Sequence, residues 1–130
     1  MAIKKFEPSK IGSVIRSRSS VTVSKNGRIY LNQALVRELP AKRAYCEMYV
    51  DDDPAQMVIR LHAEAGNDTS RVCYDKSGVT ISARRFLAWA GIDRTESRVY
   101  RAKYSEKAMG IVVDMRAPVA VSGEGRLREA

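Results

Sequence analysis

Basic side chains stand at two glycine-containing turns in corresponding parts of the chain. Lys25 and Arg28 flank Gly27 in the first turn, and Lys76 shortly precedes Gly78 in the second. A guanidinium holds a phosphate or the edge of a guanine through two hydrogen bonds, whereas a lysine acts mainly as a point charge. These residue types at turn tips favour a polyanionic partner, and nucleic acid is the first candidate.

The charge of the whole chain favours the same kind of partner. Its 130 residues include 23 Lys and Arg against 15 Asp and Glu, which gives a formal charge of +8 and a pI near 9.8. Divided after Ala65, the first half has 11 basic and 7 acidic residues, and the second has 12 and 8. Both halves are therefore equally basic. The alternative is a soluble protein whose basic surface serves no partner.

Other chemically capable residues form no catalytic or metal-binding pattern. Three consecutive acids, Asp51 to Asp53, are expected to point in different directions in a tight turn. The preference of Asp for turns therefore explains them better than a metal site. His62 ends an expected strand without a serine or cysteine partner at a recognisable spacing, and we expect it to be structural. Cys46 and Cys73 lack metal-ligand spacing and are expected to be buried free thiols. We therefore expect no enzyme activity, metal or cofactor.

The turns belong to an order of elements that occurs twice. Apolar residues alternate with polar ones on both sides of Asn26-Gly27, which is the strongest short-range signal for a hairpin. They are Val21, Val23, Ile29 and Leu31. A helical segment and two further strands, at 44–50 and 56–62, complete the unit, and a similar order follows from Arg71. A unit this small buries little apolar surface alone, so two copies are expected to share one core.

One short helix is expected in each half. Asn32 caps the first helix, which covers residues 33–39 and ends before Pro40. Ser82 has the same role in the second helix, which Gly91 ends. The apolar face of the second helix is expected to comprise Phe86, Leu87, Trp89 and Ala90. The tyrosines of the third strands are expected to pack in the core, with base stacking as the alternative: Tyr45, Tyr49, Tyr100 and Tyr104.

This pattern predicts a mainly β fold with short helices, built from two tandem ββαββ repeats. The expected parts are a basic N-terminal arm (1–19), a first repeat (20–64), a linker (65–70), a second repeat (71–115) and a flexible C-terminal tail (116–130). Arg16 and Arg18 end the arm. They are expected to follow the phosphate backbone or enter a minor groove, or else only to make the arm soluble.

The run from Gly27 to Ala41, Gly-Arg-Ile-Tyr-Leu-Asn-Gln-Ala-Leu-Val-Arg-Glu-Leu-Pro-Ala, resembles the AbrB-like (SpoVT/AbrB/MazE) family. The run Glu47-Met-Tyr-Val-Asp-Asp-Asp53 adds to this likeness. The resemblance covers residues 21–62 well and 71–115 weakly, and two copies in one chain are similar to the MraZ regulators. It implies a pseudo-dimeric, swapped-hairpin β-barrel that presents basic residues to DNA.

The resemblance also implies which residues face DNA. Carried over by position, they are Arg28 and Arg37, with Arg84 and Arg85 near the second equivalent of Arg37. The MraZ-type Asp-x-x-x-Arg signature is divided, because the first turn keeps only the arginine and the second only Asp75. A symmetric reader of palindromes is therefore not expected. With the turn lysines and the arm, the candidate DNA-binding residues are Lys25, Arg28, Arg37, Lys76, Arg84, Arg85, Arg16 and Arg18.

These observations predict a small cytoplasmic DNA-binding protein, a transcription regulator that contacts duplex DNA through one basic face. A protein-interaction module, either antitoxin-like or a small inhibitor, is the second hypothesis, and a preference for single-stranded nucleic acid is left open. No stretch has the length of a membrane span, so no membrane contact is expected. The linker spans up to about 20 Å. We therefore expect the barrel to close within one chain, as a monomeric pseudo-dimer.

Overall fold

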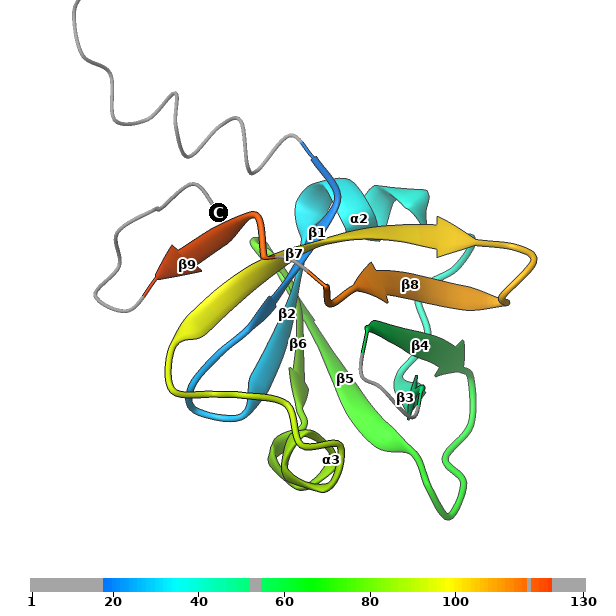
Figure 1. Cartoon of the computed structure of the whole chain (residues 1–130). Helices are drawn as coiled ribbons and strands as arrows, with labels where there is room; N and C mark the ends of the chain where they lie inside the picture. Colours follow the sequence, from blue (N-terminus) through cyan, green and yellow to red (C-terminus); the bar gives the residue numbers. More distant parts are fainter. Residues whose placement is uncertain (1–17, 52–54, 117, 123–130) are drawn as a thin grey trace, which may run out of the picture.

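The fold is a barrel of eight antiparallel strands that closes within one chain (Figure 1). The computed structural model describes residues 18–51, 55–116 and 118–122. The barrel strands are β1 (Ser20–Val23), β2 (Arg28–Asn32), β3 (Tyr45–Val50), β4 (Gln56–His62), β5 (Ser70–Asp75), β6 (Gly78–Ser82), β7 (Ser97–Ser105) and β8 (Gly110–Asp114). Their order around the barrel is β1-β2-β6-β5-β3-β4-β8-β7, and β7 pairs with β1. The expectation of a mainly β barrel is confirmed.

The hairpin β1–β2 forms as its alternating sequence predicts. Its four inward side chains are at most 1% exposed: Val21, Val23, Ile29 and Leu31. The N–H of Ser24 donates to the carbonyl of Arg28 at 2.9 Å and closes the turn. Gly27 adopts a φ of +83° in this turn, a conformation that glycine reaches without steric cost. The Asn-Gly signal therefore identified the turn correctly.

Strands from the two halves of the chain are interleaved in the barrel. Hairpin β1–β2 pairs with β7 of the second half, where Val21 lies opposite Tyr100. Hairpin β5–β6 pairs with β3 of the first half, where Tyr45 lies opposite Arg71. The seams β2–β6 and β4–β8 also join the halves. Both halves therefore contribute to a single core.

Two short helices, α2 (Gln33–Glu38) and α3 (Arg84–Trp89), follow the strands of the β2–β6 seam. Asn32 caps α2 as predicted, because its Oδ1 accepts the N–H of Leu35 at 3.0 Å. The prediction that Ser82 caps α3 is wrong. Ser82 is the last residue of β6, opposite Arg28, and Ala83 occupies the cap position without a side-chain hydrogen bond.

The helices lie at opposite ends of the barrel because β2 and β6 are antiparallel (Figure 1). Each helix places one leucine, Leu35 or Leu87, fully inside the core. Full burial of such a side chain contributes about 1.5–3 kcal/mol. In the described part of the chain, no helix is long and apolar enough to cross a membrane.

A ninth strand, β9 (Ala120–Ser122), lies within the segment that we expected to be a flexible tail. It pairs with Ser97–Val99 of β7, next to the stretch of β7 that pairs with β8. The N–H of Val119 also donates to the carbonyl of Val99 at 2.7 Å. Residues 120–122 are therefore part of the sheet. Most of the expected arm, two acids of the Asp51–Asp53 run and residues 123–130 lie outside the described residues.

We predict that Gly78→Ala destabilises the fold far more than Gly91→Ala. Both glycines have positive φ, +143° and +70°. A Cβ on Gly78 would overlap the carbonyl oxygen of Leu31, whereas a Cβ on Gly91 would meet nothing within 4 Å. The expected loss in the free energy of unfolding is about 3 kcal/mol or more for Gly78→Ala. For Gly91→Ala it is about 1 kcal/mol. Chemical denaturation measures both losses, and equal losses would contradict the close approach described for the seam.

Candidate nucleic-acid interface

The outer face of the β2–β6 seam is uncharged in the middle. Ile29 and Leu31 point inward from β2, so Arg28 and Tyr30 point outward. Tyr30 lies opposite Thr80 of β6 in the strand register. The pairings with β1 and β5 extend this outward row over four strands: Thr22, Tyr30, Thr80 and Cys73. A polar, uncharged surface therefore separates the two ends of the seam.

One end of the seam joins the first turn to α3. The carbonyl of Gly27 accepts the N–H of Ala83 at 2.8 Å. A Cβ on Gly27 would lie only 2.8 Å from the Cβ of Arg84, so the turn and the helix are in close contact. It would also lie 3.0 Å from a guanidinium nitrogen of Arg94. We call the basic residues gathered here the first basic end: Lys25, Arg28, Arg84, Arg85 and Arg94.

The other end of the seam joins the second turn to α2. The side-chain amide of Gln33 donates to the carbonyl of Lys76. Arg37 is four residues after Gln33, so it lies on the same side of α2 as this contact. The carbonyl of Arg18 accepts from the Asn32 side chain at 2.5 Å, which places Arg18 at the same end. We call Arg18, Arg37 and Lys76 the second basic end. The candidate Arg16 lies outside the described residues.

The first basic end has a large excess of positive charge. The first turn, α3 and the loop after it, 24–28 and 84–98, contain six basic and two acidic residues. One of the acids, Asp93, accepts from the N–H of Thr95 at 2.9 Å and from Arg98 at 3.0 Å. These bonds lower the pKa of Asp93. Within the described ranges, the five cations of the first basic end form no ion pair.

The second turn carries a negative charge next to its lysine. The carboxylate of Asp75 accepts from the hydroxyl and the N–H of Ser77, both at 2.7 Å, and from the N–H of Gly78 at 3.0 Å. The hydroxyl contributes most to lowering the pKa of Asp75, followed by the N–H of Ser77. Asp75 therefore stays ionised beside Lys76 at neutral pH. The attraction of this turn for a polyanion is correspondingly weaker than that of the first turn.

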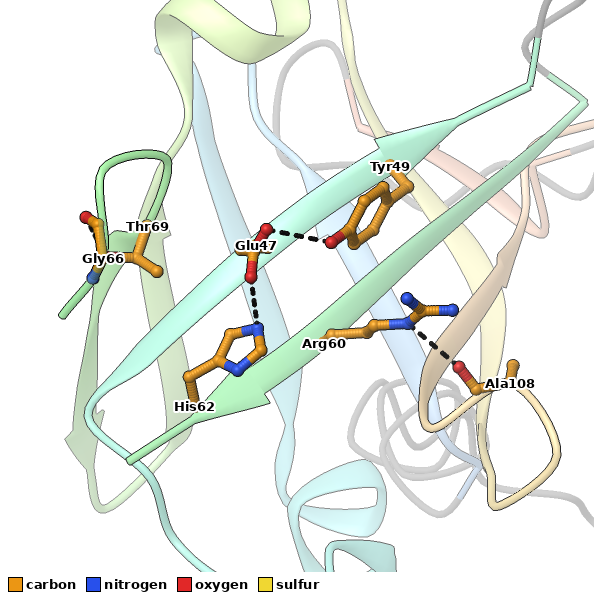
Figure 2. A network of polar contacts seen from close by, with 7 residues as sticks. All are labelled: Glu47, Tyr49, Arg60, His62, Gly66, Thr69 and Ala108. Carbon is orange, nitrogen blue, oxygen red and sulfur yellow. Dashed lines mark hydrogen bonds and ion pairs between the residues drawn. The ribbon is translucent and has the colours of Figure 1, made fainter. Parts of the chain in front are cut away.

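A polar network on the outer face of β3 and β4 accounts for His62 (Figure 2). A carboxylate oxygen of Glu47 lies 2.7 Å from Nε2 of His62, and Glu47 also accepts from the hydroxyl of Tyr49 at 2.9 Å. This hydrogen bond raises the pKa of Tyr49. Arg60 stacks on the Tyr49 ring at 4.9 Å and donates to the carbonyl of Ala108 at 3.1 Å. The polar side chains of this network contact one another, which supports the structural role expected for His62.

A pocket of about 490 Å³ on the outside of β4, β8 and β7 has mixed charge. Arg116 donates twice to Asp114, each time at 3.0 Å, and lowers the pKa of Asp114 to about 2. Asp51 accepts two backbone N–H groups of its own loop. Arg101 and Lys103 also line the pocket, so its charges largely cancel. Across the described residues, no three His, Cys, Asp or Glu side chains are grouped to hold a metal ion.

Sequence reasoning misplaced or missed four residues that matter here. Trp89, expected on the apolar face of α3, is 76% exposed, because Leu87 points inward and a residue two positions later is on the opposite side of a helix. Cys73, expected to be buried, is exposed on the outer face of β5. Arg71 lies on that same outer face. Only the tertiary contact at Gly27 identifies Arg94, since no motif links these positions.

The tyrosines of the third strands divide between the two surfaces of the barrel. Tyr100 is buried and Tyr104 packs against the core, as expected. Tyr45 and Tyr49 alternate with the buried Cys46 and therefore face outward. Their expected packing in the core is wrong, because inward and outward positions on a strand alternate strictly.

Comparisons with known proteins give no match, since no family model, curated protein or solved structure is found to be similar to the chain. The AbrB-like resemblance therefore stays a prediction that rests on the residues quoted for it. The geometry of the β2–β6 face does not depend on that resemblance, because it is observed in the structure of this chain.

We predict that one of the two thiols reacts rapidly in the native protein and that both react after unfolding. Cys46 is fully buried, and burial raises the pKa of its thiol to about 11. Cys73 is exposed. Titration with a thiol reagent at pH 8, in buffer and in denaturant, counts the reactive groups. Cys73→Ser is expected to remove the rapid reaction. Two rapidly reacting thiols in the native protein would contradict the inward orientation of Cys46.

Proposed function

We propose that the chain binds duplex DNA through the outer face of the β2–β6 seam, as a transcription regulator of the cytoplasm. The contact of Gly27 with Ala83 and Arg84 carries this proposal. It brings the cations of the first turn next to those of α3, although the two segments are far apart in the sequence. The repulsion among these cations is relieved when a polyanion neutralises them.

The spacing of the two basic ends supports a duplex as the partner. Arg28 and Asn32 are separated by four steps along β2, or about 13 Å at roughly 3.3 Å per residue. A major groove is about 12 Å wide and has phosphates along both of its edges. The two ends therefore suit phosphates on either side of one groove. The polar row with Tyr30 and Thr80 then faces the groove itself.

Arg28 is the residue best placed to contact a base. It is exposed at the edge of the polar row, opposite Ser82, and is not ion-paired with any described acid. Its planar guanidinium suits O6 and N7 of guanine. Arg37 and Lys76, at the other end, suit phosphates. Neutralisation of phosphates supplies most of the affinity in such complexes, and contacts to bases supply specificity.

The strand pairing supports a pseudo-dimer with exchanged hairpins. Exchanging β1 with β5, β2 with β6, β3 with β7 and β4 with β8 leaves the pairings among these eight barrel strands unchanged, whereas the pair β7–β9 has no counterpart in the described part of the chain. The buried pair Ile29–Ile81 lies in one seam, and the buried pair Ile59–Ile111 lies in the other. In this proposal, two ββαββ units of one chain replace the two subunits of an AbrB-like dimer. The single chain is then the binding unit.

We predict that Arg28→Ala weakens duplex binding more than Lys76→Ala. The expected loss for Arg28→Ala is about 1–3 kcal/mol if the guanidinium reads a base, and less, but equal for all sequences, if it holds only phosphate. Lys76→Ala should cost less, because Asp75 already offsets its charge. Fluorescence anisotropy with labelled duplexes measures the affinities. Lys103→Ala, on the outside of β7 next to β8, is the control that removes a charge away from the seam.

Thermal unfolding of the same variants separates binding from stability. Substitutions at exposed positions shift stability by no more than about 0.5 kcal/mol. Equal losses of affinity for Arg28→Ala, Lys76→Ala and Lys103→Ala would mean that charge acts without regard to position. Loss of folding in Arg28→Ala would mean that this arginine is structural. Either result would contradict the proposed site.

A further inference from the structure

Trp89 is the most exposed large apolar side chain in the described part of the chain. It is 76% exposed and is the single tryptophan among the 130 residues. The other two large exposed side chains are Tyr49, on which Arg60 stacks, and Met109, in the turn before β8. A partner that covered this indole would remove a large apolar surface from water, which is favourable.

The helix holds Trp89 in a defined place. Leu87 anchors α3 in the core, and Phe86 packs against that core. The ring centroids of Phe86 and Trp89 are 6.1 Å apart with an interplanar angle of 40°, within the usual range for aromatic pairs. The Phe86 ring therefore adjoins the indole and helps to hold it in place. Most of its surface is free to receive another flat ring.

Trp89 shares its side of α3 with a cation. Arg85 is four residues earlier, so the two side chains are neighbours on the exposed surface of the helix. Arg84, beside Arg85, packs its Cβ close to Gly27 and so links this surface to the first turn. Residues 24–28 and 84–98 together contain six basic residues and two acidic ones, Asp93 and Glu96. An aromatic ring within a positive surface is the combination that binds single-stranded nucleic acid.

We propose that Trp89 stacks on an unpaired base of a nucleic acid whose phosphates contact Arg85 and the first basic end. The inference rests on the proposed function and deepens it, because it names the form of DNA preferred. Inside a duplex, the faces of each base are covered by its neighbours, so an indole reaches a base face only at an end, an overhang or an unpaired position. The preferred ligand is therefore a duplex that continues into a single strand.

The single tryptophan provides a direct test. A blunt duplex and the same duplex with a short single-stranded overhang are each titrated, and both labelled-DNA anisotropy and tryptophan fluorescence are recorded. The overhang is expected to quench the fluorescence of Trp89 and to raise affinity about tenfold, as expected for one stacked base. Trp89→Ala should bind the two duplexes equally, whereas Trp89→Phe should keep part of the preference. Arg28→Ala should weaken binding of both.

The possible results separate this inference from the proposed function. Equal binding of both duplexes with unchanged fluorescence would overturn the role of Trp89 but leave duplex binding intact. Absence of binding to either duplex would overturn the proposed function itself. A multimer in light scattering that Trp89→Ala dissociates would show that the indole contacts protein, and this too would overturn the inference. Thermal unfolding of Trp89→Phe confirms that the variant is folded.

Discussion

The hydrogen bond from the N–H of Ala83 to the carbonyl of Gly27 joins the two segments on which the site depends. It follows the last pair of the β2–β6 seam, where Arg28 lies opposite Ser82. A glycine is required because the backbone has positive φ and no room for a Cβ beside Arg84. The end of the β2–β6 pairing and the clustering of cations therefore depend on the same close approach.

The two ends of the seam are alike in topology but different in chemistry. Both have a hairpin turn next to a short helix, as the exchange of strand pairs requires. The first end has five cations without an ion-paired acid among the described residues, whereas Asp75 adjoins the lysine of the second turn. Of the two described helices, α3 presents an exposed aromatic residue and α2 does not. A ligand with two equivalent halves would meet different charges and different side chains at the two ends of the seam. An asymmetric ligand therefore suits the molecule better.

Local signals in the sequence predicted most elements of the fold, and tertiary contacts account for the errors. The alternation over β1 and β2 and the cap at Asn32 were predicted correctly because each depends on neighbouring residues. The cap of α3 was misplaced because pairing with Arg28 keeps Ser82 in β6. The orientation of Trp89 was then also wrong, since it depends on which residue of α3 is buried. Arg94 joins the cluster through folding alone.

The salt dependence of duplex affinity tests the central claim most directly, because each neutralised phosphate releases counterions. If the two basic ends together neutralise four to six phosphates, the logarithm of the affinity should fall with the logarithm of salt concentration with a slope of roughly −4 to −5. Anisotropy titrations of the full chain over a range of salt concentrations give this slope. A slope near −1 would mean that only one or two phosphates are held, and would contradict a duplex held by both basic ends.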